Sequence, residues 1–262
     1  MTWALQAEWT KLRTLPSTVW LVLGTVVGTV ALGAAAIAAV DIAQCPSPTE
    51  CFEDTTKLSL TGVWLGQVTV VVLGVLAMTG EYGTRMIKPT LAAVPERRTV
   101  LVAKAVVVTA SVLVAGAVGV VGSIIAGRIL LPGNGFTVAN GYPPLSLTDG
   151  PTLRAAVGTV VYLGLVALLS LGVGAVVRDT ASAVTAVLSL LYLVPLAAGL
   201  VTDPQWHDWL DRLGPMTAGL AVQATERVDQ LPIGPWAGLG VLAAYAGAAL
   251  AVGALVLSTR DA

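Results

Sequence analysis

Residues 79–105 read TGEYGTRMIKPTLAAVPERRTVLVAKA, a charged stretch that lies between two long apolar runs. It concentrates charge in a chain that is 56% hydrophobic and only 11% charged. Its charged residues are Glu81, Arg85, Lys88, Glu96, Arg97, Arg98 and Lys104. Because charged side chains avoid hydrocarbon, this pattern is typical of a loop that joins two membrane spans.

The composition of the whole chain is that of a membrane protein. The mean hydropathy is +0.84, and the charged fraction of 11% is less than half of the roughly 25% found in soluble domains. A spanning helix needs about 20 apolar residues, and six stretches without Asp, Glu, Lys or Arg are long enough. These stretches are 19–40, 60–79, 105–127, 155–177, 181–201 and 236–257. We therefore predict an all-α integral membrane fold in which residues 1–262 form a single six-helix transmembrane domain.

The distribution of Lys and Arg predicts the orientation. If both termini are cytoplasmic, the inner segments carry nine of the fourteen basic residues. Nine basic against five acidic residues give +4 inside, and five basic against ten acidic residues give −5 outside. Because Lys and Arg hold loops on the cytoplasmic side, we expect both termini to be cytoplasmic.

Cys45 and Cys51 both fall in the first outer segment of this topology. That compartment permits oxidation, so the two could form a disulfide across a small loop. The alternative is two neighbouring free thiols. No His lies nearby, which disfavours a metal site.

The N-terminal residues 1–16 predict an interfacial elbow helix with one apolar and one polar side. Leu5, Trp9 and Leu12 lie on its apolar side, and Lys11 and Arg13 lie on its polar side. Glu8 interrupts the apolar edge, and Pro16 breaks the helix before the first span. The alternative is an ordinary basic flank that only sets the orientation.

The outer segment 203–231, before the last span, predicts further helices. An apolar stripe at spacings of three and four is formed by Trp206, Trp209, Leu210 and Leu213. Such a stripe suits a helix that rests on the outer membrane surface. A role as an extracellular lid is one interpretation, and a simple aromatic belt is the other.

Several kinds of chemistry lack their residues. No Asp, Glu, Lys, Arg or His lies within the six predicted spans, which disfavours an ion-coupled transporter. The one histidine, His207, lies in an outer segment, so His-based catalysis is disfavoured. No lysine follows the glycine pattern of a phosphate-binding loop. We therefore expect no enzymatic activity, no catalytic, metal or cofactor site in this chain, and no nucleic-acid partner.

Polar side chains inside the spans could contact a substrate or form hydrogen bonds between helices. The candidates for a substrate path are Gln67, Thr69, Tyr162, Ser189 and Tyr192. Gln67 is the most demanding of these, because an amide in hydrocarbon needs a partner.

The long inner loop itself has features beyond charge. Gly83 ends the span, Pro89 and Pro95 break helix, and Leu91 and Val94 are apolar residues among basic ones. A short helix with apolar residues and a basic rim suits a groove on a soluble partner. The orientation rule alone explains the basic residues but not the prolines or the apolar set.

These residues carry a resemblance to a known family. The run resembles the cytoplasmic loop of permease subunits of ABC-2 type ABC transporters, particularly the actinobacterial type. The matching elements are Glu81, Tyr82, Thr84, Met86, Ile87, residues 90–95, Arg97, Ala103 and Lys104. The N-terminal EWTKLRT at 8–14 and the closing RDA at 260–262 are similar to the same family. Pro89 departs from the pattern, which puts the start of a helix there in doubt.

The resemblance implies the ABC-2 permease (type V exporter) architecture: a six-helix subunit of an ATP-driven exporter in a bacterial plasma membrane. It implies a second permease subunit, as homodimer or heterodimer, and two cytoplasmic ATPase subunits that bind ATP and Mg. It also implies that residues 1–16 and 81–104 contact the ATPase and that 203–231 cap the outer side. The predicted coupling residues are Glu81, Tyr82, Gly83, Thr84, Arg85, Lys88, Leu91, Val94, Pro95, Arg97 and Arg98.

Two other functions stay open at this point. One is a membrane module that relays ATPase motion to a sensor or enzyme without transport, and the other is a passive channel. For an exporter, apolar spans with scattered hydroxyls suit a lipophilic drug, a lipid or a peptide as substrate. Membrane lipid is an expected partner in every case.

Overall fold

The computed structural model describes residues 2–42, 53–83 and 97–259. Within these ranges every regular element is a helix and none is a strand. The α-helices are α1 (Thr2–Thr14), α2 (Pro16–Ala38), α3 (Thr55–Leu60), α4 (Val63–Gly83), α6 (Arg97–Leu130), α7 (Gly150–Val177), α8 (Thr180–Ala198), α9 (Pro204–Leu213), α10 (Pro215–Leu220) and α11 (Pro235–Thr259). Single turns of 3₁₀-helix are η2 (Leu131–Asn134), η3 (Val138–Asn140), η4 (Ala221–Gln223) and η5 (Val228–Gln230).

Within the described residues, six helical segments are long and apolar enough to cross a membrane. The predicted all-α membrane class with six spans is therefore confirmed. The helices run further than the predicted spans, since α6 begins at Arg97 rather than at 105 and α7 at Gly150 rather than at 155. The reason is that the sequence limits were set by charged residues, whereas the helical backbone continues past them.

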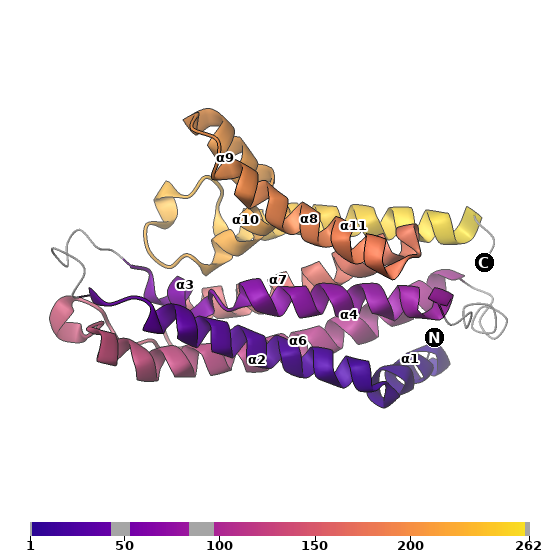
Figure 1. Ribbon diagram of the computed structural model, residues 1–262, viewed down its shortest axis with the longest axis horizontal. Helices are drawn as coiled ribbons and strands as arrows, with labels where there is room; N and C mark the ends of the chain where they lie inside the picture. The colour runs from indigo at the N-terminus through magenta and orange to yellow at the C-terminus, as the bar shows by residue number, and fades with distance from the viewer. Residues whose placement is uncertain (1, 43–52, 84–96, 260–262) are drawn as a thin grey trace.

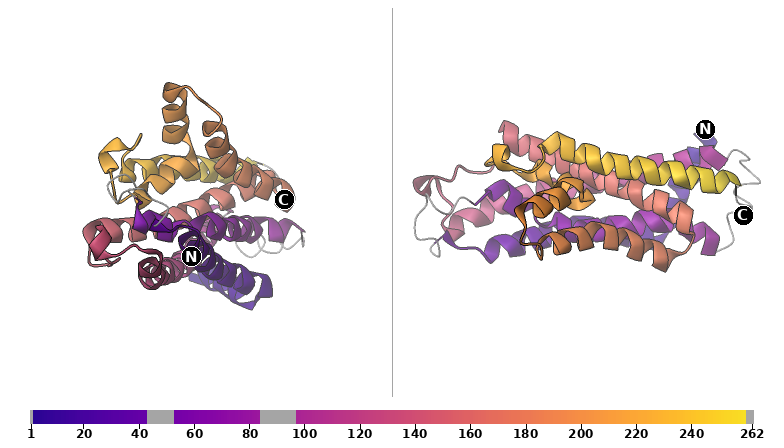
Figure 2. Two further views of the ribbon diagram at one scale, coloured as in Figure 1. Left: turned by 60° about the vertical axis from the view of Figure 1, so that its left-hand side comes forward. Right: turned by 90° about the horizontal axis from the view of Figure 1, so that it is seen from above.

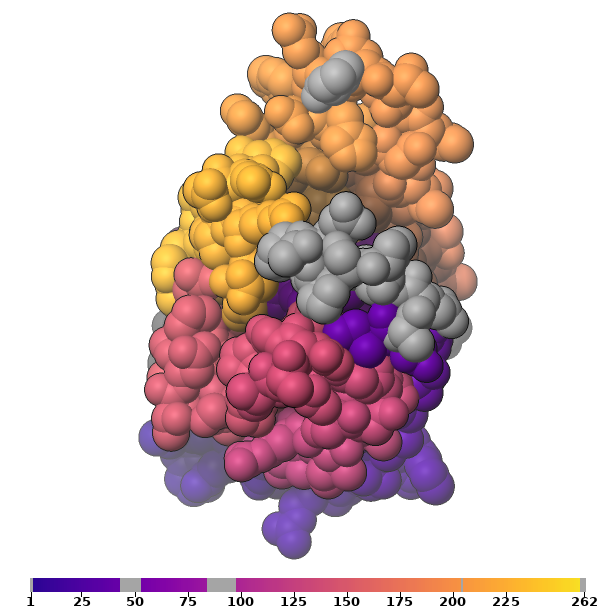
Figure 3. All heavy atoms as spheres, turned by 90° about the vertical axis from the view of Figure 1, so that its left-hand side faces the viewer, coloured from indigo at the N-terminus to yellow at the C-terminus, as the bar shows by residue number. Residues whose placement is uncertain are grey.

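The six long helices form an elongated bundle in which they run roughly side by side (Figures 1 and 2). α1 and the C-terminal end of α11 lie at the same end, called the α1 end below. α3 and residues 131–149 lie at the opposite end. α9 stands out above the rest of the molecule in Figure 3, which faces this opposite end.

The centre of the bundle is formed by α4 and α7. In their most apolar segments 56% and 61% of residues are buried, against 22% in α2, α8 and α11. Tyr162, Leu163 and Val166 of α7 are completely buried. Since other helices of the protein cover most of α4 and α7, the wide exposed apolar faces belong to α2, α8 and α11.

Close backbone contacts at two glycines hold helices together. A side-chain carbon at Gly62 would lie 1.7 Å from the carbonyl oxygen of Thr29 on α2. At Gly238 of α11 it would lie 1.9 Å from the carbonyl oxygen of Ala218 on α10. Only glycine fits such contacts, so these residues let α2 approach the start of α4, and α10 approach α11.

The joint between α1 and α2 is a break of one residue. α1 ends at Thr14 and α2 begins at Pro16, with Leu15 in an extended conformation between them. Proline suits the first turn of a helix, where its missing N–H is not needed. α1 therefore leaves the axis of α2 (Figure 1), and Trp3 and Trp9 are exposed on it.

α7 and α8 are joined by two residues at the α1 end. Arg178 adopts a left-handed conformation with φ of 62°, and its N–H donates to the carbonyl of Gly174. Its guanidinium donates to the carbonyl oxygen of Val256 on α11 at 3.3 Å. This turn therefore holds α7, α8 and α11 together at one end.

Candidate functional site

Four charged residues from three helices meet at the α1 end. Glu8 and Lys11 come from α1, Glu81 from the last turn of α4, and Lys104 from the second turn of α6. Lys104 Nζ lies 2.8 Å from Glu8 Oε2 and 2.6 Å from Glu81 Oε1. Lys11 Nζ lies 2.8 Å from Glu8 Oε1 and 2.7 Å from Glu81 Oε1. We call these four residues the ionic cluster.

The cluster is buried and its formal charges cancel. Lys104 is 2% exposed, Glu8 7% and Glu81 8%. An unpaired charge in such a position costs several kcal/mol, whereas a paired and hydrogen-bonded one is tolerated. Two carboxylates and two ammonium groups that share hydrogen bonds meet this condition, so the three helix ends are held in a fixed arrangement.

Lys11 is the most exposed member of the cluster, with 37% of its side chain accessible. Burial by itself lowers the pKa of this amine, but its hydrogen bonds and charge interactions with Glu8 and Glu81 outweigh that effect. The pKa of Lys11 is therefore raised above its usual 10.5. The amine is protonated at neutral pH and remains a donor.

The position of the cluster in the chain connects it with the predicted coupling loop. Glu81 precedes residues 84–96 by less than one helical turn, and Lys104 follows them by two turns. The two helices that flank this segment, α4 and α6, are thus both linked to α1. A force applied to residues 84–96 would act on α4 and α6 next to the cluster.

The predicted coupling residues are only partly within the described ranges. Glu81 belongs to the cluster, and Tyr82 lies under the guanidinium of Arg178, 5.1 Å from its ring centre. Gly83 is the last residue of α4, and Arg98 is exposed on α6. Outside the description lie Thr84, Arg85, Lys88, Leu91, Val94, Pro95, the side chain of Arg97, and also Cys45 and Cys51 of the predicted disulfide.

The predicted elbow residues occupy different environments. Lys11 is in the ionic cluster, and Leu12 packs against the hydrophobic core. Leu5 is half-buried, whereas Trp9 and Arg13 are exposed. The sequence treated Glu8 only as an interruption of the apolar edge, whereas the structure shows that Glu8 is buried and pairs with Lys104 of α6. The spacing of three residues between Glu8 and Lys11, which places both on one helix face, was the sequence pattern that could have indicated an ion pair.

Among the predicted path residues, Gln67 and Tyr162 lie in the middle of the bundle. Both are completely buried. The hydroxyl of Tyr162 donates to Gln67 Oε1, and Gln67 Nε2 donates to the sulfur of Met216 on α10 at 3.3 Å. These bonds join α4, α7 and α10, an arrangement that the sequence did not predict for Met216.

The remaining path residues lie nearer the surface of α4 and α8. Thr69 shares a hydrogen bond of 2.7 Å with Thr25 of α2. The hydroxyl of Tyr192 donates to the carbonyl of Trp64, and Ser189 is half-buried on α8. None of the five path residues lines either of the two cavities described below, and their contact with a substrate stays a prediction.

Asp54 links two segments at the end opposite α1. It caps α3 by accepting from the N–H of Lys57 at 2.9 Å. The same carboxylate accepts from the hydroxyl of Thr225 at 2.8 Å and from the N–H of Glu226 at 3.1 Å. Arg154 of α7 donates to the carbonyl of Ala224 at 2.6 Å. Residues 224–226 are thus fastened to α3 and α7, which no sequence pattern indicated.

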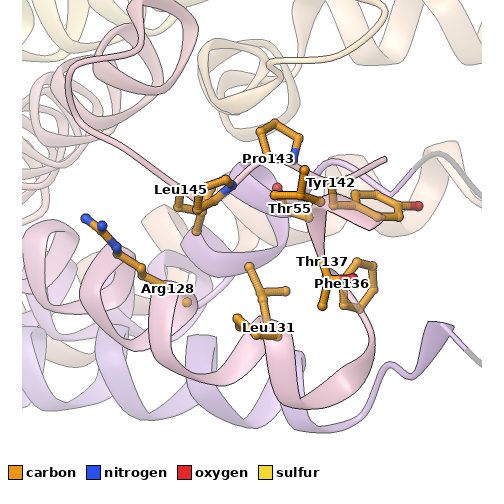
Figure 4. Close-up of a pocket in the computed structure, with 12 residues that line it drawn as sticks. Thr55, Arg128, Leu131, Phe136, Thr137, Tyr142, Pro143 and Leu145 are labelled. Carbon is orange, nitrogen blue, oxygen red and sulfur yellow. The ribbon is translucent and has the colours of Figure 1, made fainter. Parts of the chain in front are cut away.

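Two cavities accompany these sites. One of about 420 Å³ lies between α1, α2, α4 and α6, and the ionic cluster lines one part of it. The other, of about 240 Å³, lies at the opposite end beside residues 131–145 (Figure 4). There Phe136 and Tyr142 pack edge to face with ring centres 5.0 Å apart. Arg128 extends away from these two rings (Figure 4).

In the described ranges no group of three or more His, Cys, Asp or Glu could hold a metal ion.

Comparison with known proteins assigns the chain to a family. A family model described as ABC-2 family transporter protein matches residues 4–196. A search of curated proteins returned no match. The matched region runs from α1 into α8 and covers more than half of the 262 residues. The chain therefore belongs to the ABC-2 transporter family, as one of its multi-pass membrane components.

Proposed function

We propose that this chain is the permease subunit of an ATP-driven exporter, in which it forms the substrate path and couples to a separate cytoplasmic ATPase. Membership of the family implies an ABC ATPase partner in general. The proposal adds two ATPase copies, each with ATP and Mg, and a second permease subunit. It also adds the assignment of residues 81–98 as the main contact with the ATPase.

The ionic cluster is the observation that supports this coupling. It joins α1, α4 and α6 at one end of the bundle through bonds of 2.6 to 2.8 Å. Lys104 and Glu81 are buried at the two helices that flank residues 84–96. A push on this segment would move α1, α4 and α6 as one unit, because separating them would expose or unpair buried charges.

The proposed orientation places the α1 end in the cytoplasm of a bacterium, with both termini there. Nine of the fourteen basic residues then lie inside, with a formal balance of +4 inside and −5 outside. The ionic cluster and the segment 84–96 would then face the compartment that supplies ATP. Residues 203–231, with α9 and α10, would lie on the outer side.

The proposed substrate is a lipophilic drug, a lipid or a peptide. The polar side chains that the described spans bury are mostly hydroxyls, and those of Gln67 and Tyr162 are hydrogen-bonded to one another. A path with hydroxyl and amide groups along apolar walls selects for molecules that are mostly apolar. A strongly charged substrate would find no matching buried charge beside these two residues.

The proposal is tested by co-expressing the chain with an ABC ATPase encoded next to it and reconstituting the pair in vesicles. We expect ATP-dependent, vanadate-sensitive movement of a lipophilic dye from the ATPase side. The control is the same vesicle with an ATPase that cannot hydrolyse ATP. Dye movement without ATPase would indicate a channel, and ATPase stimulation without movement of any substrate class would indicate a relay module; either outcome overturns the proposal.

A further inference from the structure

The cavity beside the ionic cluster has the shape of a groove with one polar and one apolar part. Its volume of about 420 Å³ lies within the range of roughly 300–1,000 Å³ that is usual for ligand sites. The apolar wall comes from three spanning helices and α1. It includes Leu12, Leu21, Leu73, Leu76, Val107 and Val108.

The polar part contains a carboxylate oxygen that lacks a donor. Glu81 Oε1 accepts from both Lys11 and Lys104, whereas the buried Glu81 Oε2 has no hydrogen-bond partner within the described ranges. A buried carboxylate oxygen without a donor loses its solvation and gains nothing in return. Glu81 lines the groove, so a ligand there could supply the missing donor once a small rotation of the carboxyl group exposes Oε2.

Lys11 offers the opposite kind of site next to Glu81. An ammonium group has three N–H donors, and the bonds of Lys11 to Glu8 and Glu81 use two of them. Its side chain is 37% exposed and lines the same groove. The groove therefore presents an acceptor for a cationic donor and a donor for an anionic group, within reach of one zwitterion.

The depth of the two parts matches that of a phospholipid. α1 carries the exposed residues Trp3 and Trp9, and aromatic residues of this kind mark the membrane–water interface. On α4, Leu73 lies eight residues before Glu81, which is about 12 Å towards the middle of the bundle at 1.5 Å per residue. The ionic cluster is thus at headgroup level, and the apolar wall extends along the hydrocarbon.

The need of Glu81 Oε2 for an N–H donor also favours some lipid headgroups over others. A primary ammonium group carries N–H donors that Glu81 Oε2 can accept, whereas a quaternary choline ammonium carries none. An anionic headgroup without an ammonium group likewise brings no N–H donor for Glu81 Oε2. The formal charges of the cluster already cancel, so a zwitterion adds no net charge to a buried site.

We propose that this groove binds one aminophospholipid from the adjacent leaflet. One acyl chain lies along α2, α4 and α6, the phosphate accepts from Lys11, and the primary ammonium donates to Glu81 Oε2. The proposal concerns the isolated chain and does not depend on transport or on an ATPase. The site differs from the predicted path residues, none of which lines this groove.

The test uses the full chain in nanodiscs with a phosphatidylethanolamine that carries a photoreactive group on one acyl chain. We expect labelling of peptides from α4 and α6 near Leu76 and Val107. The phosphatidylcholine with the same acyl chains should label these peptides roughly tenfold less, as expected for the loss of a charge-assisted hydrogen bond. Equal labelling by both lipids would overturn the headgroup assignment, and labelling elsewhere would overturn the site.

Two variants and a control separate binding from folding. Leu76→Trp fills the groove without touching the ionic cluster and should abolish labelling by either lipid. Glu81→Gln should remove the preference for the primary amine while labelling by the choline lipid persists. Val114→Trp, at a position of α6 that is 67% exposed, is the matched control and should label like the wild type. Wild-type labelling of Leu76→Trp would contradict the proposal.

Discussion

Lys104 Nζ lies 2.6 Å from Glu81 Oε1, which ties the beginning of α6 to the end of α4 although 23 positions separate the two residues in the chain. The same amine reaches Glu8 on α1 at 2.8 Å. A buried lysine thereby determines how three helix ends sit together. Without it, two buried carboxylates would depend on Lys11 alone.

Replacing this lysine is therefore expected to destabilise the protein strongly. Lys104→Met keeps the volume of the side chain but removes its charge, and breaking a buried pair in this way costs about 3–5 kcal/mol. Melting of the purified protein in detergent measures the effect. Arg98→Met, at an exposed position of the same helix, is the control and should change little. Adding Glu81→Gln to Lys104→Met should recover part of the loss, and a lack of any difference between Lys104→Met and the control would contradict the role of the cluster.

The pH dependence of α1 follows from Lys11. Its pKa in the folded protein is raised above 10.5 because its hydrogen bonds to the glutamates outweigh the effect of burial. The stabilisation is fully present below the unfolded value of about 10.4 and is lost as the pH rises through the higher folded value. The melting temperatures of wild type and Lys11→Met should therefore converge only in strongly alkaline buffer. Convergence already at neutral pH would show that Lys11 is not paired.

The docking assignment is tested by the apolar residues of the coupling loop. Replacing Leu91 and Val94 together by Asp should abolish co-purification of the ATPase and ATP-dependent transport, because buried apolar contacts would become charged. Membrane insertion should be unaffected. Leu147→Asp, at the opposite end of the bundle, is the control and should retain the ATPase. Normal co-purification by the double variant would refute this assignment.

The hydrogen bond between Tyr162 and Gln67 is expected to contribute to stability. Tyr162→Phe removes the donor to Gln67 Oε1 and should cost about 0.6–2 kcal/mol, the range for polar contacts between membrane helices. Tyr245→Phe, at a position of α11 that is 37% exposed, is the control. Thermal unfolding of both variants decides the matter, and equal losses would show that the bond between α4 and α7 contributes nothing.

The contact of Asp54 with residues 225 and 226 should limit motion at the end opposite α1. Asp54→Ala removes the cap of α3 and the acceptor for Thr225 and Glu226. Faster amide hydrogen exchange is expected in peptides that cover 221–230. Asp229→Ala, an exposed change in the same segment, should leave that exchange as it is. Exchange that is unchanged in Asp54→Ala would show that other contacts hold the segment.

Hydropathy was sufficient to predict the six spans but not their full length. A hydropathy window ends a span at Lys104 or Arg154 because it treats each charged side chain as if it had no partner. In the folded chain Lys104 has two carboxylate partners and Arg154 a carbonyl, so the helix continues through both. Pairing across 96 positions, as between Glu8 and Lys104, has no local signature.

The candidate site residues were also predictable only where a local sequence pattern exists. Glu81 was predicted as a coupling residue and Lys11 as part of the elbow helix; these roles stay predictions, and the ion pair that the two form in the structure was not predicted. The partner of Glu8 was not predicted, because helical periodicity indicates which face is apolar and not which polar residue finds a partner. Met216 and Thr225 were missed since their contacts depend on how the segment after α8 folds back on the bundle.

The two-residue turn at Arg178 and Asp179 constrains how this bundle can change shape. Its left-handed backbone and the bond from Arg178 to Val256 clamp α7, α8 and α11 to one another at a single extremity. If these three helices separate, the distance between them therefore increases towards the end opposite α1. An opening between them would accordingly form on the side of α9 and α10, while the end with the Arg178 turn stays closed.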